Sequence, residues 1–86
     1  MSRICFADDG WEDYLYWQLH DKKTLRKINA LLKSIDRDGV MGGEGKPEKL
    51  KYRTNDYSRR IDDANRLVYA LDGETILVKS CRGHYC

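Results

Sequence analysis

Three side chains in the second half of this sequence could exchange a proton or stabilise a negative charge. Glu48 follows a glycine-rich stretch, Arg66 follows a polar turn, and His84 lies near the C-terminus. A carboxylate and an imidazole can act as base and acid, and guanidinium groups can stabilise charge on phosphoryl oxygens. Such a set is suited to metal-free cleavage of RNA. A base would deprotonate the ribose 2′-hydroxyl, that oxygen would attack the adjacent phosphorus, and an acid would protonate the departing 5′ oxygen.

The sequence leaves open which of Glu48 and His84 is the base and which is the acid. Their reference pKa values, about 4.3 and about 6.5, would let either side chain serve after modest tuning by its surroundings. The same residue types occur in most small proteins, and Glu48 could merely form an exposed ion pair with Lys51. Spacing alone therefore does not establish an enzyme.

A basic segment spans residues 45–60, although the whole chain carries a net charge of only +2. Such a concentrated patch favours binding to a polyanion more than a high overall charge does. The alternative is an ordinary solvated face. The segment has a local charge of +4, from Lys46, Lys49, Lys51, Arg53, Arg59 and Arg60 against Glu48 and Asp56.

The residue pattern does not predict a metal cofactor. Cys81, His84 and Cys86 crowd one end of the chain without a second ligand cluster, which is a weak zinc pattern. No pair of carboxylates has a spacing that would hold two hard cations. Without a metal to activate water, the available nucleophile would be the 2′-hydroxyl of the RNA itself.

Two amphipathic helices are expected to follow a short strand at residues 3–6. Asp21 is a plausible N-cap for the second helix, and a linker of about two residues predicts an antiparallel helical hairpin. Each helix should turn an apolar stripe toward the core. The stripes are Trp11, Tyr14, Leu15 and Leu19 in the first helix, and Leu25, Ile28, Leu32 and Ile35 in the second.

The residues after the glycine-rich stretch at 39–47 favour strands. Residues 57–62 and 67–71 alternate, Asp72-Gly73 predicts a two-residue hairpin turn, and residues 76–80 continue the last strand. The order of strand, two helices and antiparallel meander predicts an α+β fold with the helices on one face of the sheet. The 86 residues form one expected domain, 1–86, without a membrane span or signal peptide, so we expect a cytoplasmic protein.

Several short runs between Trp11 and Tyr85 together resemble one known family. They are Trp11-Glu12-Asp13-Tyr14-Leu15-Tyr16-Trp17-Gln18, Lys27-Ile28-Asn29, Gly45-Lys46-Pro47-Glu48 with Leu50-Lys51, Ser58-Arg59-Arg60-Ile61, Arg66-Leu67-Val68-Tyr69 and His84-Tyr85. In this order and spacing they resemble the Txe/YoeB family of toxins. The resemblance implies a RelE-like fold and a ribosome-dependent messenger RNA endonuclease encoded beside a Phd/YefM-type antitoxin. We also expect that the protein can self-associate as a homodimer.

The same resemblance implies roles for individual residues. Glu48 matches the general base of the family, Arg66 its transition-state arginine, His84 its general acid and Tyr85 the tyrosine that orients the substrate. Tyr69 is interpreted as core. The expected RNA-binding residues are Lys46, Lys51 and Arg60, which stand where the family places phosphate-contacting charges, and Arg59 of the basic segment.

Three positions depart from the family pattern, and two other functions stay open. Tyr57 replaces a usual tryptophan, Asn65 stands where some relatives carry histidine, and Cys86 follows the usual terminal tyrosine. The alternatives are a ParE-type inhibitor that acts by binding a protein, and a basic RNA-binding module without catalysis. A pure binder would have no need to assemble Glu48, Arg66 and His84.

Overall fold

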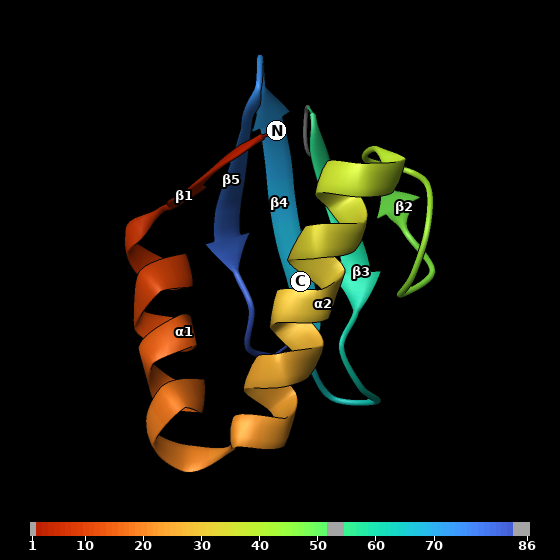
Figure 1. Ribbon diagram of the computed structural model, residues 1–86. Coiled ribbons are helices and arrows are strands. Elements are labelled where there is room, and N and C mark those ends of the chain that lie inside the picture. Colours follow the sequence, from red (N-terminus) through yellow and green to blue (C-terminus); the bar gives the residue numbers. More distant parts are fainter. Residues whose placement is uncertain (1, 52–54, 84–86) are drawn as a thin grey trace.

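The computed structural model describes residues 2–51 and 55–83, in which two helices and five strands follow the expected order (Figure 1). The predictions for His84, Tyr85 and Cys86 lie outside the described residues. The elements are β1 (Arg3–Phe6), α1 (Asp8–His20), α2 (Lys22–Asp38), β2 (Glu48–Lys49), β3 (Asp56–Arg60), β4 (Arg66–Asp72) and β5 (Thr75–Ser80).

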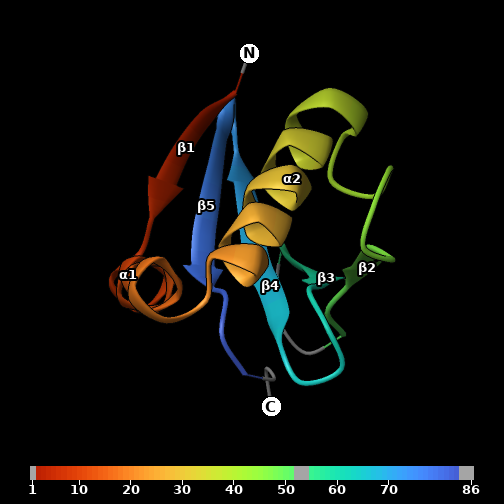
Figure 2. The same cartoon turned by 60° about the horizontal axis from the view of Figure 1, so that its bottom comes forward.

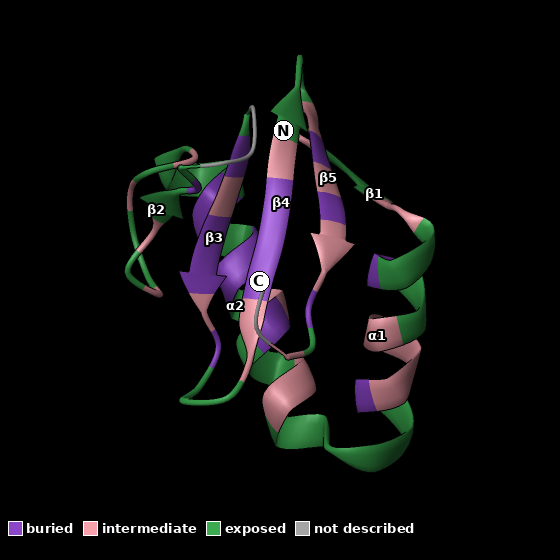
Figure 3. Ribbon diagram, turned by 180° about the vertical axis from the view of Figure 1, so that it is seen from behind, coloured by how far each residue is buried: buried purple, intermediate pink, exposed green. Residues whose placement is uncertain are grey.

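The strands form one sheet in the order β1-β5-β4-β3-β2. The pairs from β2 to β5 are antiparallel, and β1 pairs parallel with β5. Both helices lie on one side of this sheet (Figures 1 and 2), while the view from behind shows β3 and β4 without a covering helix (Figure 3). The predicted α+β architecture is therefore confirmed. Neither helix in the described part of the chain is long and apolar enough to cross a membrane.

Helix α2 forms as its sequence predicts. The carboxylate of Asp21 accepts hydrogen bonds from the backbone N–H groups of Lys23 and Thr24, which confirms the N-cap. The helix ends at Gly39, whose φ of 86° suits glycine. Its stripe packs into the core against residues of β4 and β5 that alternate inward. This core includes Ile28, Leu31, Leu32, Ile35, Leu67, Tyr69, Ile76 and Val78.

The predicted apolar stripe of α1 is confirmed only in part, because Tyr14 packs against the core but two other members are exposed. Trp11 is 46% exposed and Leu19 is 81% exposed, whereas the buried residues of this helix are Gly10 and Trp17. A Cβ at Gly10 would lie 2.3 Å from the carbonyl oxygen of Val78, so glycine lets the helix approach the backbone of β5. Trp17 lies seven residues further along the same face. Contact of the helix backbone with the strand therefore decides which face of α1 is buried.

The hairpin between β4 and β5 turns one residue later than predicted. Asp72 pairs with Thr75, so the two loop residues are Gly73 and Glu74 rather than Asp72 and Gly73. Gly73 has a φ of 60° and Glu74 does not have a positive φ, which matches a type II′ turn with glycine at the first central position.

Candidate active site

The alternation of residues along the strands separates the two faces of the sheet. Leu67 and Tyr69 of β4 belong to the core beneath α2, so Arg66 must point to the helix-free face. In the β3–β4 register Arg60 lies opposite Arg66, and in the β2–β3 register Glu48 lies opposite Ser58. Polar side chains from three neighbouring strands therefore share the face without helices.

Arg66 connects the other two strands of this polar cluster. Its Nη2 donates a hydrogen bond to Oε1 of Glu48 over 3.1 Å, and its Nε donates to Oγ of Ser58 over 2.9 Å. The side chain of Arg66 is 18% exposed and that of Glu48 is 49% exposed, while Ser58 is fully buried. The structure therefore brings together Glu48 and Arg66, two of the predicted catalytic residues. We call Glu48, Ser58 and Arg66 the three-strand cluster.

Ser58 is a member of this cluster that the sequence reasoning did not assign a role. Its signal was its place in the run Ser58-Arg59-Arg60 and its position on the same strand face as Arg60. A short side chain at this position can be buried and still accept a hydrogen bond from the arginine of the neighbouring strand.

The last described residue of the chain, Gly83, is held at the start of β4. The N–H of Arg66 donates to the carbonyl of Gly83 over 3.0 Å, and the N–H of Gly83 donates to Oδ1 of Asn65 over 2.8 Å. The side-chain amide of Asn65 donates in turn to the carboxylate of Asp62. The last described residue is therefore held by hydrogen bonds to both Asn65 and Arg66.

The predicted RNA-binding residues differ in their solvent exposure. Lys46 and Lys51 are exposed. Arg60 is 43% exposed and forms an ion pair with Asp63. Because exposed ion pairs contribute only about 0–1 kcal/mol, Arg60 can exchange this partner for a phosphate at little cost.

The prediction that Arg59 binds RNA is wrong. Its side chain has no exposed surface and points to the helix side of the sheet. There, each of its three guanidinium nitrogens donates at least one hydrogen bond. Composition cannot distinguish this arginine from its neighbour Arg60, because only the pleat of β3 sends one inward and the other outward. The exposed charge of the basic segment is accordingly lower than its sequence indicates.

The three-strand cluster has the chemistry of a proton acceptor beside a fixed cation. A half-exposed carboxylate can take a proton from a bound substrate, and the adjacent guanidinium can stabilise negative charge. The interaction between the two is a charge-assisted hydrogen bond, which fixes their relative position more firmly than a neutral one would.

Metal ligation has little support among the residues that the structure describes. There, no group of three or more histidine, cysteine or acidic side chains could hold a metal ion. Cys81 is fully buried, and burial raises the pKa of its thiol to about 12. A zinc ligand must be a thiolate, so this environment disfavours Cys81 as a ligand.

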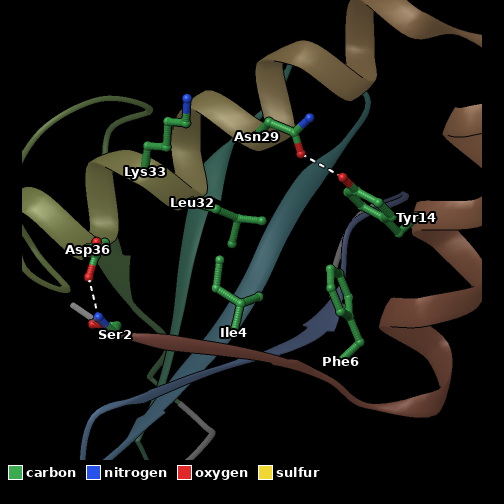
Figure 4. A pocket seen from close by; sticks show the side chains of 8 residues that line it. All are labelled: Ser2, Ile4, Phe6, Tyr14, Asn29, Leu32, Lys33 and Asp36. Atoms are coloured by element: carbon green, nitrogen blue, oxygen red, sulfur yellow. Dashed lines mark hydrogen bonds between the residues drawn. The ribbon is translucent and has the colours of Figure 1, made fainter.

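A separate apolar groove of about 460 Å³ lies between β1 and α2, at the other edge of the sheet from β2 (Figure 4). Ile4 and Phe6 line its floor, and four of its polar residues form two hydrogen-bonded pairs. Tyr14 donates to Asn29 over 2.7 Å, and the N–H of Ser2 donates to Asp36 over 2.7 Å. The lining also includes Lys33, but the carboxylate of this groove, Asp36, bonds to a backbone N–H, whereas Glu48 of the three-strand cluster bonds to a guanidinium.

Comparisons with known proteins agree over nearly the full chain. Residues 6–85 match the family model of the YoeB-like toxin of bacterial type II toxin-antitoxin systems. Toxin YoeB of Escherichia coli (strain K12) is 43% identical over 84 residues, which cover 96% of this chain and 99% of the relative.

Solved structures from Staphylococcus aureus are also similar to this fold. The YoeB dimer superposes with a TM-score of 0.92 at 53% identity and covers 98% of both chains. A heterotetrameric YoeB–YefM toxin–antitoxin complex gives a TM-score of 0.91 at 52% identity over 99% of both chains.

Proposed function

This chain belongs to the family of YoeB-like toxins of bacterial type II toxin-antitoxin systems, and from that membership we propose that it is an endoribonuclease that cuts messenger RNA. The observation that carries the proposal is the three-strand cluster, in which Arg66 lies 3.1 Å from the carboxylate of Glu48. An enzyme that transfers protons beside a phosphate needs this combination of groups at close range.

In the proposed reaction the nucleophile is the 2′-hydroxyl of the RNA. Glu48 and His84 divide the roles of base and acid between them, and Arg66 stabilises the charge that develops on the phosphoryl oxygens. Tyr85 orients the substrate. The products are a 2′,3′-cyclic phosphate and a 5′-hydroxyl, because the attacking oxygen belongs to the same ribose as the phosphate that it attacks.

Exposed cations around the cluster bind the RNA backbone in this proposal. Lys46 lies two residues before Glu48 in sequence, Lys51 lies beyond β2, and Arg60 lies across from Arg66 in the β3–β4 pair. Phosphate contacts of this kind position a strand without reading its sequence.

Dependence on the translating ribosome is the second part of the proposal. The cluster lies on a sheet face with a half-exposed carboxylate, and few exposed cations surround it. A site of this kind binds a flexible RNA strand weakly and in many orientations, whereas a ribosome holds messenger RNA in one geometry and so reduces the entropic cost of reaching it. The protein would accordingly act in the cytoplasm.

We also propose the partners of this toxin. The similar YoeB of Staphylococcus aureus is described as a dimer and, with YefM, as a heterotetrameric toxin–antitoxin complex. By analogy this chain pairs with a Phd/YefM-type antitoxin and forms a homodimer. An acidic segment of the antitoxin would compete with RNA for Lys46, Lys51 and Arg60, because complementary charges favour encounter.

The proposal is tested with ribosome-bound messenger RNA carrying one 2′-deoxynucleotide on the 5′ side of the cleavage site. Cleavage there should stop, while cleavage of the all-ribose message continues. Glu48→Gln and Arg66→Ala should each lower the single-turnover rate by roughly 10²–10³-fold in a protein with wild-type circular dichroism. Undiminished cutting of the deoxy message would reject attack by the 2′-hydroxyl, and wild-type rates in both variants would reject the site.

Equal cleavage of naked and ribosome-bound RNA at matched concentration would contradict the ribosome dependence. A protein that stopped growth without cutting any RNA would instead support the ParE-type alternative, in which a toxin acts by binding a protein.

A further inference from the structure

The buried Arg59 lies directly beneath the glycine-rich loop that leads to Glu48. We propose that Arg59, together with the hydroxyl of Tyr69, is a positioning residue that fixes this loop and so holds Glu48 within hydrogen-bond distance of Arg66. This inference rests on the proposed function, because it assigns a role in the same active site. We call residues 39–47 the glycine loop.

The guanidinium of Arg59 bonds to the loop at two points. Nη2 donates to the carbonyl of Gly39 over 2.8 Å, and Nη1 donates to the carbonyl of Glu44 over 2.7 Å. Nη1 also donates to Oγ of Ser34 on α2 over 3.1 Å, and the N–H of Glu44 donates to the same oxygen over 3.0 Å. One side chain therefore ties the first and sixth residues of the loop to helix α2.

Tyr69 completes this arrangement from the neighbouring strand. Its hydroxyl accepts a 2.9 Å hydrogen bond from Nε of Arg59 and donates a 2.6 Å hydrogen bond to the carbonyl of Val40. The N–H of Arg60 binds one further loop carbonyl, that of Gly45. Four loop carbonyls thus accept hydrogen bonds from β3 and β4 side chains or backbone.

Filling this space with a buried arginine is energetically unfavourable compared with an apolar side chain. Burial of a charge is strongly unfavourable unless hydrogen bonds compensate it, and apolar residues of similar size often stabilise a protein as well or better. The side chain of Arg59 adds what an apolar residue cannot supply, namely several donors in one plane aimed at backbone carbonyls. Its position therefore favours a role in specifying the loop backbone rather than in filling the core.

The shape of the loop sets where β2 begins. Gly45 and Lys46 have φ values of 87° and 51°, so the chain turns sharply just before Pro47 and Glu48. A Cβ at Gly45 would lie 2.7 Å from Leu31, which shows how closely this turn packs on α2. Because β2 has only two residues, its own pairing with β3 is a weak constraint on Glu48. The fixed turn supplies the remaining constraint.

The decisive test is a double-mutant cycle between Tyr69→Phe and Glu48→Gln, measured as single-turnover cleavage of ribosome-bound message. Tyr69→Phe keeps the ring in the core and removes only the hydroxyl. A change such as Arg59→Met would remove four buried hydrogen bonds at once and could prevent folding. We expect Tyr69→Phe to lower the rate at saturating protein by about 10–100-fold with little change in the half-saturating concentration, since small misplacements of reacting groups cost this much. In the Glu48→Gln background the same change should have almost no further effect.

A destabilising change far from the loop separates positioning from general loss of stability. Ile76→Val removes one buried methyl group on β5, so it should lower the Tm but leave the cleavage rate unchanged. Amide hydrogen exchange of residues 39–46 should accelerate in Tyr69→Phe but not in Ile76→Val.

The possible results separate a failure of the active-site assignment from a failure of the positioning role. If Glu48→Gln cleaves at the wild-type rate, the active-site assignment fails. If Glu48→Gln is slow but Tyr69→Phe keeps the wild-type rate, or lowers the rate by the same factor in both backgrounds, the positioning role of Arg59 and Tyr69 is overturned. Arg59→Lys should also be slow, because an ammonium cannot reproduce the planar set of donors.

Discussion

Nε of Arg66 donates a 2.9 Å hydrogen bond to Oγ of Ser58, a hydroxyl buried between β2 and β4. This bond restricts the orientation of the guanidinium, whose Nη2 donates to Glu48 over 3.1 Å. Arginine side chains otherwise have many rotamers, and each alternative orientation would move the charge away from the substrate phosphate.

Ser58→Ala should therefore lower the proposed cleavage rate without unfolding the protein. We expect a loss of about tenfold, less than for Arg66→Ala, because the charge stays and only its orientation is relaxed. Single-turnover cleavage and thermal unfolding measure the two effects separately. Ser80→Ala at the end of β5 is the matched control and should keep the wild-type rate.

Lys46→Ala, Lys51→Ala and Arg60→Ala should weaken RNA binding rather than slow the chemical step. Each change should raise the half-saturating concentration of ribosome-bound message by roughly 3–10-fold, since one phosphate contact is lost. A titration of protein against cleavage rate at two salt concentrations checks this. A fall in the saturated rate with unchanged half-saturation would assign the residue to the reaction itself. Lys33→Ala, on the exposed side of α2, is the control.

The carboxylate at the start of α2 should make folding stability depend on acid pH. The hydrogen bonds from the side chain and backbone of Thr24 hold the pKa of Asp21 below its ordinary value of 3.8. The charged cap therefore stabilises the native state fully above that pH and loses its contribution as pH falls through the lower, folded-state pKa.

Asp21→Asn is the matched variant, because asparagine also caps helices but carries no charge. The Tm of the wild type should exceed that of Asp21→Asn at pH 7, and the difference should narrow below about pH 4. Differential scanning calorimetry across this range would show a constant difference if the cap acted only as a neutral hydrogen-bond acceptor.

Cys81 should resist alkylation while the protein is folded. Burial, and to a smaller degree the nearby charge of Asp13, raises the pKa of Cys81 to about 12, so almost no thiolate exists at pH 8. In a Cys86→Ser background, iodoacetamide should modify the exposed Cys5 and leave Cys81 unmodified until denaturant is added. Mass spectrometry of the peptides would reveal equal labelling if this region opened readily.

The contact between Glu48 and Arg66 could be predicted from the sequence because it depends on hairpin pairing and on the alternation of side chains along strands. A hairpin at residues 62–65 places Arg60 opposite Arg66, and alternation sends both side chains to one face. Glu48 then needs only a neighbouring antiparallel strand. Ser58 becomes a hydrogen-bond partner of Arg66 through the pairing of β3 with β4. The sequence alone does not fix the register of that pairing.

The errors concern residues whose surroundings come from distant parts of the chain. Arg59 can be buried because carbonyls of the folded glycine loop accept hydrogen bonds from its guanidinium. The periodicity of the sequence does not predict where those carbonyls lie. Helix α1 turns Trp17 inward because Gly10 packs against the backbone of β5, and the indole N–H of Trp17 then donates to the carbonyl of Cys81 over 2.8 Å. Charge and apolar spacing describe single elements, whereas these two side chains are placed by contacts between elements.

The parallel pairing of β1 with β5 has a consequence for the kinetics of folding. This pair joins residues from nearly opposite ends of the sequence, Arg3 with Thr75 through Phe6 with Val78. Contacts between such distant residues form late and slow the overall folding rate, since the intervening chain must lose its freedom first. During synthesis, the helices can form early, yet the sheet cannot close until β5 has left the ribosome. Until then, the edge of β4 that later pairs with β5 has no partner strand.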